Sequence, residues 1–168
     1  MNLPTPFWAE PEKKFNMKMT TKGRYAVTAM LDLALHDTEG TVNLADISRR
    51  QDISLTYLEQ LFSKLKRNKL VDSARGPGGG YRLAQKIEDI SIAKIIYSVD
   101  EPIDVTRCGG KQNCQGDLRC LTHDLWMELN LHISEFLNGM TLADLIKRNN
   151  IKQVAERQDI VMMQLQRQ

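Results

Sequence analysis

Cysteine is scarce in this chain and is confined to one short segment. The 168 residues hold 3 cysteines, all between positions 108 and 120. An odd number of clustered cysteines argues against a disulfide-stabilised secreted domain and favours metal or redox chemistry in a reducing cytoplasm. The chain also lacks any apolar run near the roughly 20 residues that a membrane-spanning helix requires. We therefore expect a cytoplasmic protein with no membrane partner.

The fingerprints of nucleotide-binding enzymes are missing as well. The glycine-rich residues 76–81 contain no G-x-x-x-x-G-K-[ST] motif, and Tyr81 stands where G-x-G-x-x-G needs its last glycine. Apart from the cysteine segment, no group of titratable residues in the sequence suggests a substrate site. We expect no enzyme activity. The alternative from another functional class is an iron–sulfur redox enzyme that uses a winged-helix scaffold.

Charge is small in total but unevenly distributed. The formal net charge is +2, whereas residues 17–82 alone hold 11 Lys/Arg against 7 Asp/Glu. Such an excess is a mild indication of nucleic-acid binding in that part of the chain. Residues 1–16 contain three prolines and lack the basic-then-apolar order of a signal peptide. They are expected to form a disordered N-terminal extension.

Three amphipathic helices are predicted after this extension. Residues 21–36 repeat apolar side chains at helical spacing, and Asn43 is placed to cap a short helix over 44–51. Ser54 is placed to cap a third helix that runs to about residue 65. Asp52 lies between them, where a tight turn needs a residue that tolerates left-handed geometry. This order predicts a helix-turn-helix.

The outer face of the third helix carries short polar and amide side chains that suit the edges of DNA bases. A plain solvent-exposed helix face is the alternative. The candidate DNA-contacting residues of this helix and its cap are Ser54, Thr56, Tyr57, Glu59 and Gln60.

A β-hairpin is predicted over residues 70–83, because apolar residues flank a turn that is too rich in glycine for a helix. A hairpin that follows a recognition helix is a wing. Arg75 near its tip is a candidate contact with the minor groove of DNA. The fold class is therefore mainly α with a small β-hairpin wing, and residues 17–83 form a winged helix-turn-helix domain that binds double-stranded DNA.

The second half is predicted to be helical apart from one loop. Residues 84–106 form a connecting segment with a helix that Ser91 caps, and residues 107–123 form a ligand-bearing loop. Residues 121–147 hold a long apolar helix over 121–138 and a short helix from Thr141 to Lys147. We expect the long helix to form a homodimer, with packing on its own domain as the alternative. Residues 148–168 are expected to be a polar, frayed tail that could hold a loose helix.

The loop presents four metal-ligand side chains as C-x5-C-x5-C-x2-H: Cys108, Cys114, Cys120 and His123. Zinc sites favour C-x2-C pairs, which are absent. A disulfide switch leaves one cysteine over, and inert cysteines prefer apolar neighbours. An iron–sulfur cluster fits best, because it needs spread thiolates and accepts hydrogen bonds from backbone amides. Zinc, thiol redox chemistry and nitric-oxide sensing remain the alternatives.

Several motifs resemble the bacterial regulators of iron–sulfur cluster assembly, within a wider family of dimeric winged-helix repressors. The resemblance covers roughly residues 17–150 and lies in five segments in the same order: residues 21–32, 44–48, 53–62, 75–81 and the C-x5-C-x5-C-x2-H loop.

This resemblance implies a homodimer with one 2Fe–2S cluster per subunit, held by Cys108, Cys114, Cys120 and His123 and supplied by the cluster-assembly machinery. It implies repression of the cluster-assembly operon by the loaded form and a second class of DNA site for the cluster-free form. It also implies that Glu59 rejects one site class without the cluster and that Arg75 contacts a groove. Thr56 stands where the family has serine, which keeps the hydroxyl.

A histidine among thiolates suits a sensor. It leaves the site one negative charge short of four thiolates, and it titrates near neutral pH, so protons compete with iron for it. We expect a cluster held in this way to be lost when its supply falls.

Overall fold

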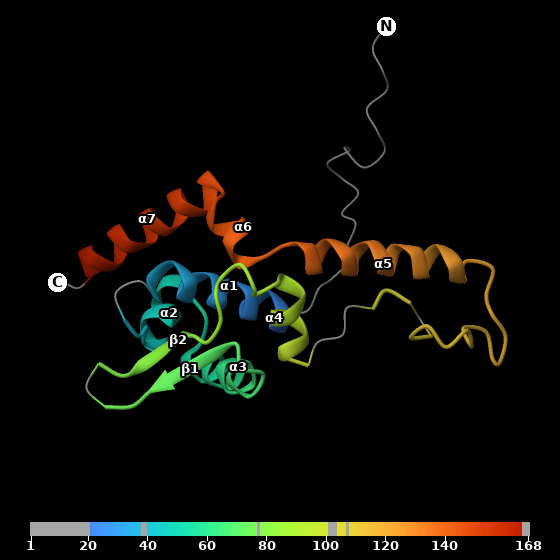
Figure 1. The fold of residues 1–168 in the computed structure, drawn as a ribbon, viewed down its shortest axis with the longest axis horizontal. Helices are drawn as coiled ribbons and strands as arrows, with labels where there is room; N and C mark the ends of the chain where they lie inside the picture. The colour runs from blue at the N-terminus through green and yellow to red at the C-terminus, as the bar shows by residue number, and fades with distance from the viewer. Residues whose placement is uncertain (1–20, 38–39, 77, 101–103, 107, 166–168) are drawn as a thin grey trace, which may run out of the picture.

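The computed structural model describes residues 21–37, 40–76, 78–100, 104–106 and 108–165. Helices α1 to α4 and a two-stranded hairpin form one body, from which helix α5 extends with the cysteine loop at its far end (Figure 1). Helix α7 lies on the other side of that body. The predicted disordered extension, residues 1–16, lies outside the described residues.

The helix-turn-helix is confirmed, and local capping explains where its helices begin. It comprises α1 (Thr21–His36), α2 (Leu44–Gln51) and α3 (Leu55–Arg67). The side chain of Asn43 accepts a hydrogen bond from the N–H of Ala45 at 2.9 Å, and the hydroxyl oxygen of Ser54 accepts one from the N–H of Tyr57 at 3.2 Å. Asp52 adopts a left-handed φ of 51°, which turns the chain between α2 and α3.

The wing is an antiparallel hairpin of β1 (Val71–Ala74) and β2 (Gly80–Leu83). The wing contacts the body at Tyr81. The backbone of Tyr81 forms a β-bridge with Val42, and its ring packs edge-on against Phe62 with a centroid distance of 4.9 Å. A Cβ at Gly80 would lie 2.5 Å from the carbonyl oxygen of Val42, so this approach requires glycine. The mainly α fold with a β-hairpin wing is therefore confirmed.

Helix α4 (Ile92–Ser98) closes the core of this body. Its Ser91 cap is confirmed, because the hydroxyl oxygen accepts from the N–H of Lys94 at 3.2 Å. The helix packs mainly against α1. Burial of a large apolar side chain stabilises a fold by roughly 1.5–3 kcal/mol. The fully buried side chains that share this core include Met30, Leu33, Ile47, Leu58, Phe62, Leu65, Ile95 and Ile96.

Helix α5 (His123–Gly139) begins two residues later than the predicted Leu121. Leu121 is fully exposed, and Thr122 takes the N-cap position, so the apolar character of Leu121 does not extend the helix. The short α6 (Leu142–Ile146) follows, where Thr141 and Asp144 form a capping box. The predicted helix start at Thr141 is confirmed.

The expected polar tail is an ordered helix for most of its length rather than a frayed end. Residues Asn149–Leu165 form α7, a helix of 17 residues. Side chains at 151, 155, 158, 159 and 162 are partly buried, which is the spacing of one helix face. The amide of Gln51 in α2 donates to the amide oxygen of Gln158 at 3.0 Å, so α7 is held against the helix-turn-helix. No helix in the described part of the chain is long and apolar enough to cross a membrane.

Candidate metal centre and nucleic-acid interface

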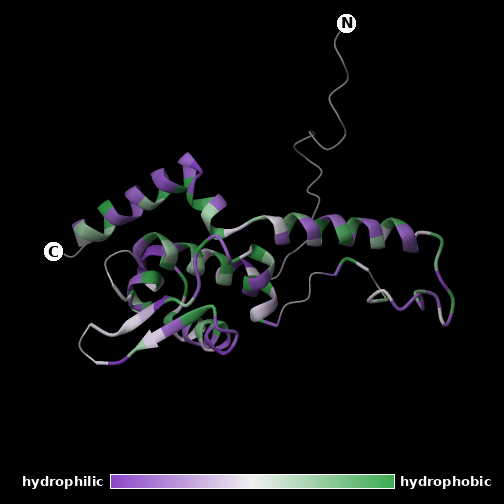
Figure 2. Ribbon diagram, viewed as in Figure 1, coloured by the Kyte–Doolittle hydropathy of each residue, from purple (hydrophilic) through white to green (hydrophobic). Residues whose placement is uncertain are grey.

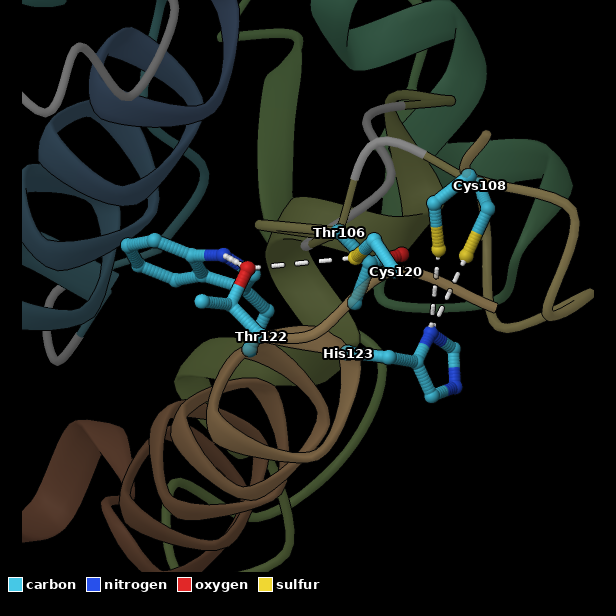
Figure 3. Close-up of a pocket in the computed structure, with 7 residues that line it drawn as sticks. Thr106, Cys108, Cys120, Thr122 and His123 are labelled. Atoms are coloured by element: carbon cyan, nitrogen blue, oxygen red, sulfur yellow. Dashed lines mark hydrogen bonds between the residues drawn. The ribbon is translucent and has the colours of Figure 1, made fainter. Parts of the chain in front are cut away.

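The four predicted ligands line one cavity where the cysteine loop meets the start of α5. Figure 3 labels three of them, Cys108, Cys120 and His123. His123 is the first residue of α5 and is 4% exposed. Its backbone N–H donates to the carbonyl oxygen of Cys120 at 3.2 Å, which joins the last turn of the loop to the helix. Gly109 and Gly110 have φ values of 59° and 78°, which let the chain fold back after Cys108.

The structure brings three of the four ligand atoms into one compact group. Nδ1 of His123 lies 3.5 Å from Sγ of Cys108 and 3.2 Å from Sγ of Cys114, and all three atoms lie within 4.8 Å of one another. Cys120 lies outside this group. It lines the same cavity of about 240 Å³, together with the other three ligands and Thr106, Thr122 and Trp126.

The sulfurs influence each other's ionisation. Desolvation raises the pKa of Cys108, but hydrogen bonds from Cys114, the nearby backbone and Thr106 outweigh it and lower that pKa. A hydrogen bond from Cys114 lowers the pKa of Cys120 as well. The backbone of Cys120 acts to lower the pKa of Cys114, yet desolvation and its two sulfur neighbours raise it overall. Each of the three thiols therefore affects the protonation of another, and a bound metal would displace their protons.

The donor set fits an iron–sulfur cluster. Three sulfurs and one imidazole are the ligand types that such clusters and zinc both use. The cavity has room for more than one ion, since a single water needs only about 10–15 Å³ of comparable space. Its ligands come from both ends of a loop rather than from one short knuckle. These features favour a polynuclear group over a single zinc ion.

Two residues beside the ligands were not predicted from the sequence. The indole Nε1–H of Trp126 donates to the hydroxyl oxygen of Thr122 at 3.1 Å, and that oxygen lies 3.8 Å from Sγ of Cys120. The i, i+4 spacing of Thr122 and Trp126 was the available signal. This spacing did not indicate a site, because Trp126 lies within the predicted apolar helix.

The candidate DNA-contacting residues of α3 differ in their exposure. Thr56, Glu59 and Gln60 are exposed on the outer face of the helix. Ser54 is exposed too, but its hydroxyl oxygen caps the helix. Tyr57 is only half-exposed, and its ring packs edge-on against Tyr25 with a centroid distance of 5.9 Å. Tyr57 is therefore held by the body of the domain, with less freedom to reach DNA than its neighbours.

Arg75 is exposed where β1 ends at the tip of the wing. The hydroxyl of Thr41 donates to the carbonyl oxygen of Gly78 at 2.5 Å and fixes the tip against the loop before α2. Lys66 of α3 donates to the hydroxyl of Ser73 at 2.5 Å. These bonds hold the wing beside the recognition helix, so Arg75 and the outer face of α3 have a fixed relation.

A buried polar network behind the helix-turn-helix was also not predicted. The carboxylate of Asp32 on α1 is fully buried and accepts from Arg50 at 2.7 Å and from Gln51 at 2.6 Å. His36 reaches Asp159 of α7 with its Nε2 at 3.1 Å. Charged groups of this kind need partners inside a protein, and these partners come from three helices. The network fixes α2 relative to α1 and α7.

The predicted apolar stripe of α5 divides into two parts. Ile133 and Leu137, near its C-terminal end, pack on the core of the body. The part that extends away contains hydrophobic residues between hydrophilic ones (Figure 2). The exposed apolar residues that we call the α5 surface are Leu121, Leu125, Trp126, Met127, Leu131 and Phe136. This surface is the candidate contact with a second copy of the chain.

The sequence of the chain is similar to known proteins over most of its length. The Rrf2 family, described as an iron-dependent transcriptional regulator, matches residues 19–148. The HTH-type transcriptional regulator IscR of Photobacterium profundum is 58% identical over 146 residues, which are 87% of this chain and 85% of the relative. The regulator of the same name from Aliivibrio salmonicida is 60% identical over 144 residues, which are 86% of each chain.

Solved structures give the same result. IscR of T. potens is 38% identical with a TM-score of 0.64, and the match covers 79% of this chain and 88% of that one. CymR, the global cysteine regulator of B. subtilis, is 35% identical with a TM-score of 0.67, over 77% and 95% of the two chains. The first two relatives are named HTH-type transcriptional regulators. The chain belongs to the Rrf2 family of iron-dependent transcriptional regulators.

Proposed function

We propose that this regulator is a homodimer that senses iron–sulfur cluster supply with one 2Fe–2S cluster per subunit, taken from the cluster-assembly machinery. Cys108, Cys114, Cys120 and His123 are its ligands. The loaded form represses the cluster-assembly operon, and loaded and cluster-free forms select different promoters. Thr56, Glu59 and Gln60 of α3 and Arg75 of the wing contact DNA, with Ser54 and Tyr57 at the start of α3.

The observation that carries this proposal is the meeting of Cys108, Cys114 and His123 within 4.8 Å, with Cys120 on the wall of the same cavity. The bound cluster would supply a charged, oxidant-sensitive group that can be gained and lost. The chain supplies three thiolates and an imidazole. An imidazole in place of a fourth thiolate leaves the bound site one negative charge short of an all-thiolate site, and this ligand set favours release.

The contacts between helices offer a path from the ligands to DNA. The amide oxygen of Asn130 in α5 accepts from the N–H of Val105 at 3.1 Å, so the segment just before the loop is tied to α5. The junction of α5 and α6 pairs with α4, since Ile92 donates its N–H to the carbonyl oxygen of Met140 at 2.8 Å. Asn68, which ends α3, donates to the carbonyl oxygen of Ser98 in α4 at 3.2 Å.

These contacts join the loop, α5, α4 and α3 in a continuous series. Ordering of the four ligands fixes the loop and the first turn of α5. A changed placement of α5 would move the recognition helices of a dimer relative to each other. DNA sites are read by pairs of such helices at fixed half-site spacing, so a small shift changes which promoters are bound.

The proposal is tested by purifying the protein without air, recording its visible spectrum and counting iron and sulfide. A coloured protein with about two of each per chain is the expected result. Colourless protein with one zinc per chain supports a zinc-stabilised regulator instead. Colourless protein without metal, whose DNA binding responds to thiol oxidation or nitric oxide, supports a thiol sensor.

The link to DNA is tested with the triple variant Cys108→Ala/Cys114→Ala/Cys120→Ala. We expect it to lose the cluster and to bind a different set of promoter fragments from the loaded protein. Gln115→Ala is the matched control, because Gln115 lies in the same loop and is exposed. Identical promoter preferences of the triple variant and the loaded protein would rule out a cluster-dependent switch.

A further inference from the structure

Thr122 holds the N-cap position of α5 but does not act as a cap. A threonine at this position usually accepts a hydrogen bond from a backbone N–H of the first turn. Here its side chain makes no such bond. Its oxygen instead accepts from the indole of Trp126 at 3.1 Å and lies 3.8 Å from Sγ of Cys120 (Figure 3). The hydroxyl is thus placed between an indole and a candidate ligand sulfur.

The chemistry of these groups assigns the protons. An indole N–H can only donate, so the Thr122 oxygen is the acceptor in the contact with Trp126. The hydroxyl proton is then available for another acceptor. A ligand sulfur is a thiolate and has no proton to donate, so in a metal-bound site the hydroxyl of Thr122 donates to Cys120. The direction of both bonds follows, from Trp126 to Thr122 to Cys120.

We propose that Thr122 and Trp126 are positioning residues for Cys120, and that their two hydrogen bonds orient its sulfur and raise the reduction potential of the cluster. This inference rests on the proposed function. Hydrogen bonds to ligand sulfurs are one means by which a protein sets the potential of an iron–sulfur site. Reduction adds negative charge that the sulfurs share, and a donor to sulfur stabilises the reduced form.

Two substitutions separate the hydrogen bonds from packing. Thr122→Val keeps the branched shape and removes the hydroxyl, and no helix cap is lost because the side chain makes none. Trp126→Phe keeps an aromatic ring and removes the indole N–H. Both variants should move the reduction potential to a more negative value, with the larger shift for Thr122→Val. The double variant should match Thr122→Val alone, because Trp126 acts through Thr122.

The test is a potentiometric titration of anaerobically purified full-length protein, with Thr122→Ser as the variant that restores the hydroxyl. The Thr122→Ser protein should keep a potential close to that of the parent. An unchanged potential in Thr122→Val, with the cluster bound, overturns the inference and leaves the proposed function standing. Parent protein that takes up no iron and sulfide overturns both. If Thr122→Val takes up no cluster, retention by Thr122→Ser supports the role of the hydroxyl and loss in both variants overturns it.

A second readout needs no cluster. Trp8 and Trp126 are the two tryptophans of the chain, so a Trp8→Phe background leaves Trp126 as the single tryptophan emitter. In cluster-free protein, Thr122→Val removes the acceptor of the indole N–H and should shift the emission of Trp126, whereas Thr122→Ser should not. Identical emission in all three proteins would show that the bond between Trp126 and Thr122 is not formed in solution.

Discussion

Among single residues, His123 has a position in the candidate centre that the cysteines do not share. It is 4% exposed and fixed at the start of a helix, whereas the three cysteines are only partly buried. Cys108 and Cys114 reach its Nδ1 from a glycine-containing loop. The imidazole is therefore the most buried donor of the site, and the first turn of α5 sets its position.

Arg75 at the tip of the wing gives a prediction for DNA binding. Arg75→Ala should weaken binding to promoter DNA by about 1–3 kcal/mol if the guanidinium enters a groove. Fluorescence anisotropy at one fixed salt concentration measures the change. Lys86→Ala is the matched control, because it removes an exposed positive charge outside the wing. Equal affinities of the two variants would show that Arg75 acts only as one more surface charge.

Residue-scale chemistry was only partly predictable from the sequence. The spacing of the cysteines and His123 identified one cavity, because ligands within a short loop cannot lie far apart. The link from Trp126 to Thr122 could not be predicted, since it depends on two rotamers. The packing of Tyr57 on Tyr25 joins two different helices. The sequence pattern of α3 alone therefore predicted Tyr57 to be exposed.

At the scale of helices and strands, local signals were reliable and distant ones were not. Asn43, Ser54, Ser91 and Thr141 each cap the helix that the sequence predicted, because capping depends on the next two or three residues. Helix α7 was expected at most as a loose helix. Its partners on α1 and α2 lie more than 100 residues earlier, as in the pair of Gln51 and Gln158.

The buried network explains why α1, α2 and α7 keep one arrangement. Burial raises the pKa of Asp32, but hydrogen bonds from His36, Arg50 and Gln51 outweigh it and lower that pKa to about 2. The hydrogen bond to Asp32 raises the pKa of His36 to about 9, against desolvation and the repulsion of Arg50. Asp159 faces the other ring nitrogen of His36. At neutral pH the network thus holds two positive groups between two carboxylates.

A pH-dependent stability follows from His36. Its pKa is raised from 6.5 to about 9 on folding, so its contribution is complete below pH 6.5 and is lost as the pH rises through about 9. The free energy of unfolding of the parent should exceed that of His36→Gln at about pH 6, and the difference should shrink by about pH 9.5. Urea unfolding at both values measures it.

The control for this experiment is His132→Gln, which removes an exposed histidine of α5 from the surface. Its difference from the parent should be small, because its side chain is exposed. A difference for His36→Gln that stays constant between the two pH values would contradict a protonated His36 in the folded protein.

For the whole molecule, the important feature is the separation of the two candidate sites. The metal centre lies at the far end of α5, while α3 and the wing lie on the body (Figure 1). In the described part of the chain the two sites lie apart, and α5 with its contacts to α4 offers a path between them. A helix that extends away with an apolar surface also needs a partner. A second copy that covers the α5 surface would fix two metal centres and two recognition helices relative to one another.

This arrangement predicts that dimerisation and DNA binding are lost together. Leu131 is 56% exposed on the α5 surface, and Leu131→Glu places a charge where a dimer would bury it. Sedimentation equilibrium should show monomers, and affinity for a two-fold promoter site should fall by roughly tenfold or more because one recognition helix no longer positions the other. Val161→Glu on α7, at a residue that is 53% exposed, is the matched control and should remain dimeric. A Leu131→Glu protein that remains a dimer with unchanged DNA affinity would place the dimer contact elsewhere and would remove α5 from the path between the two sites.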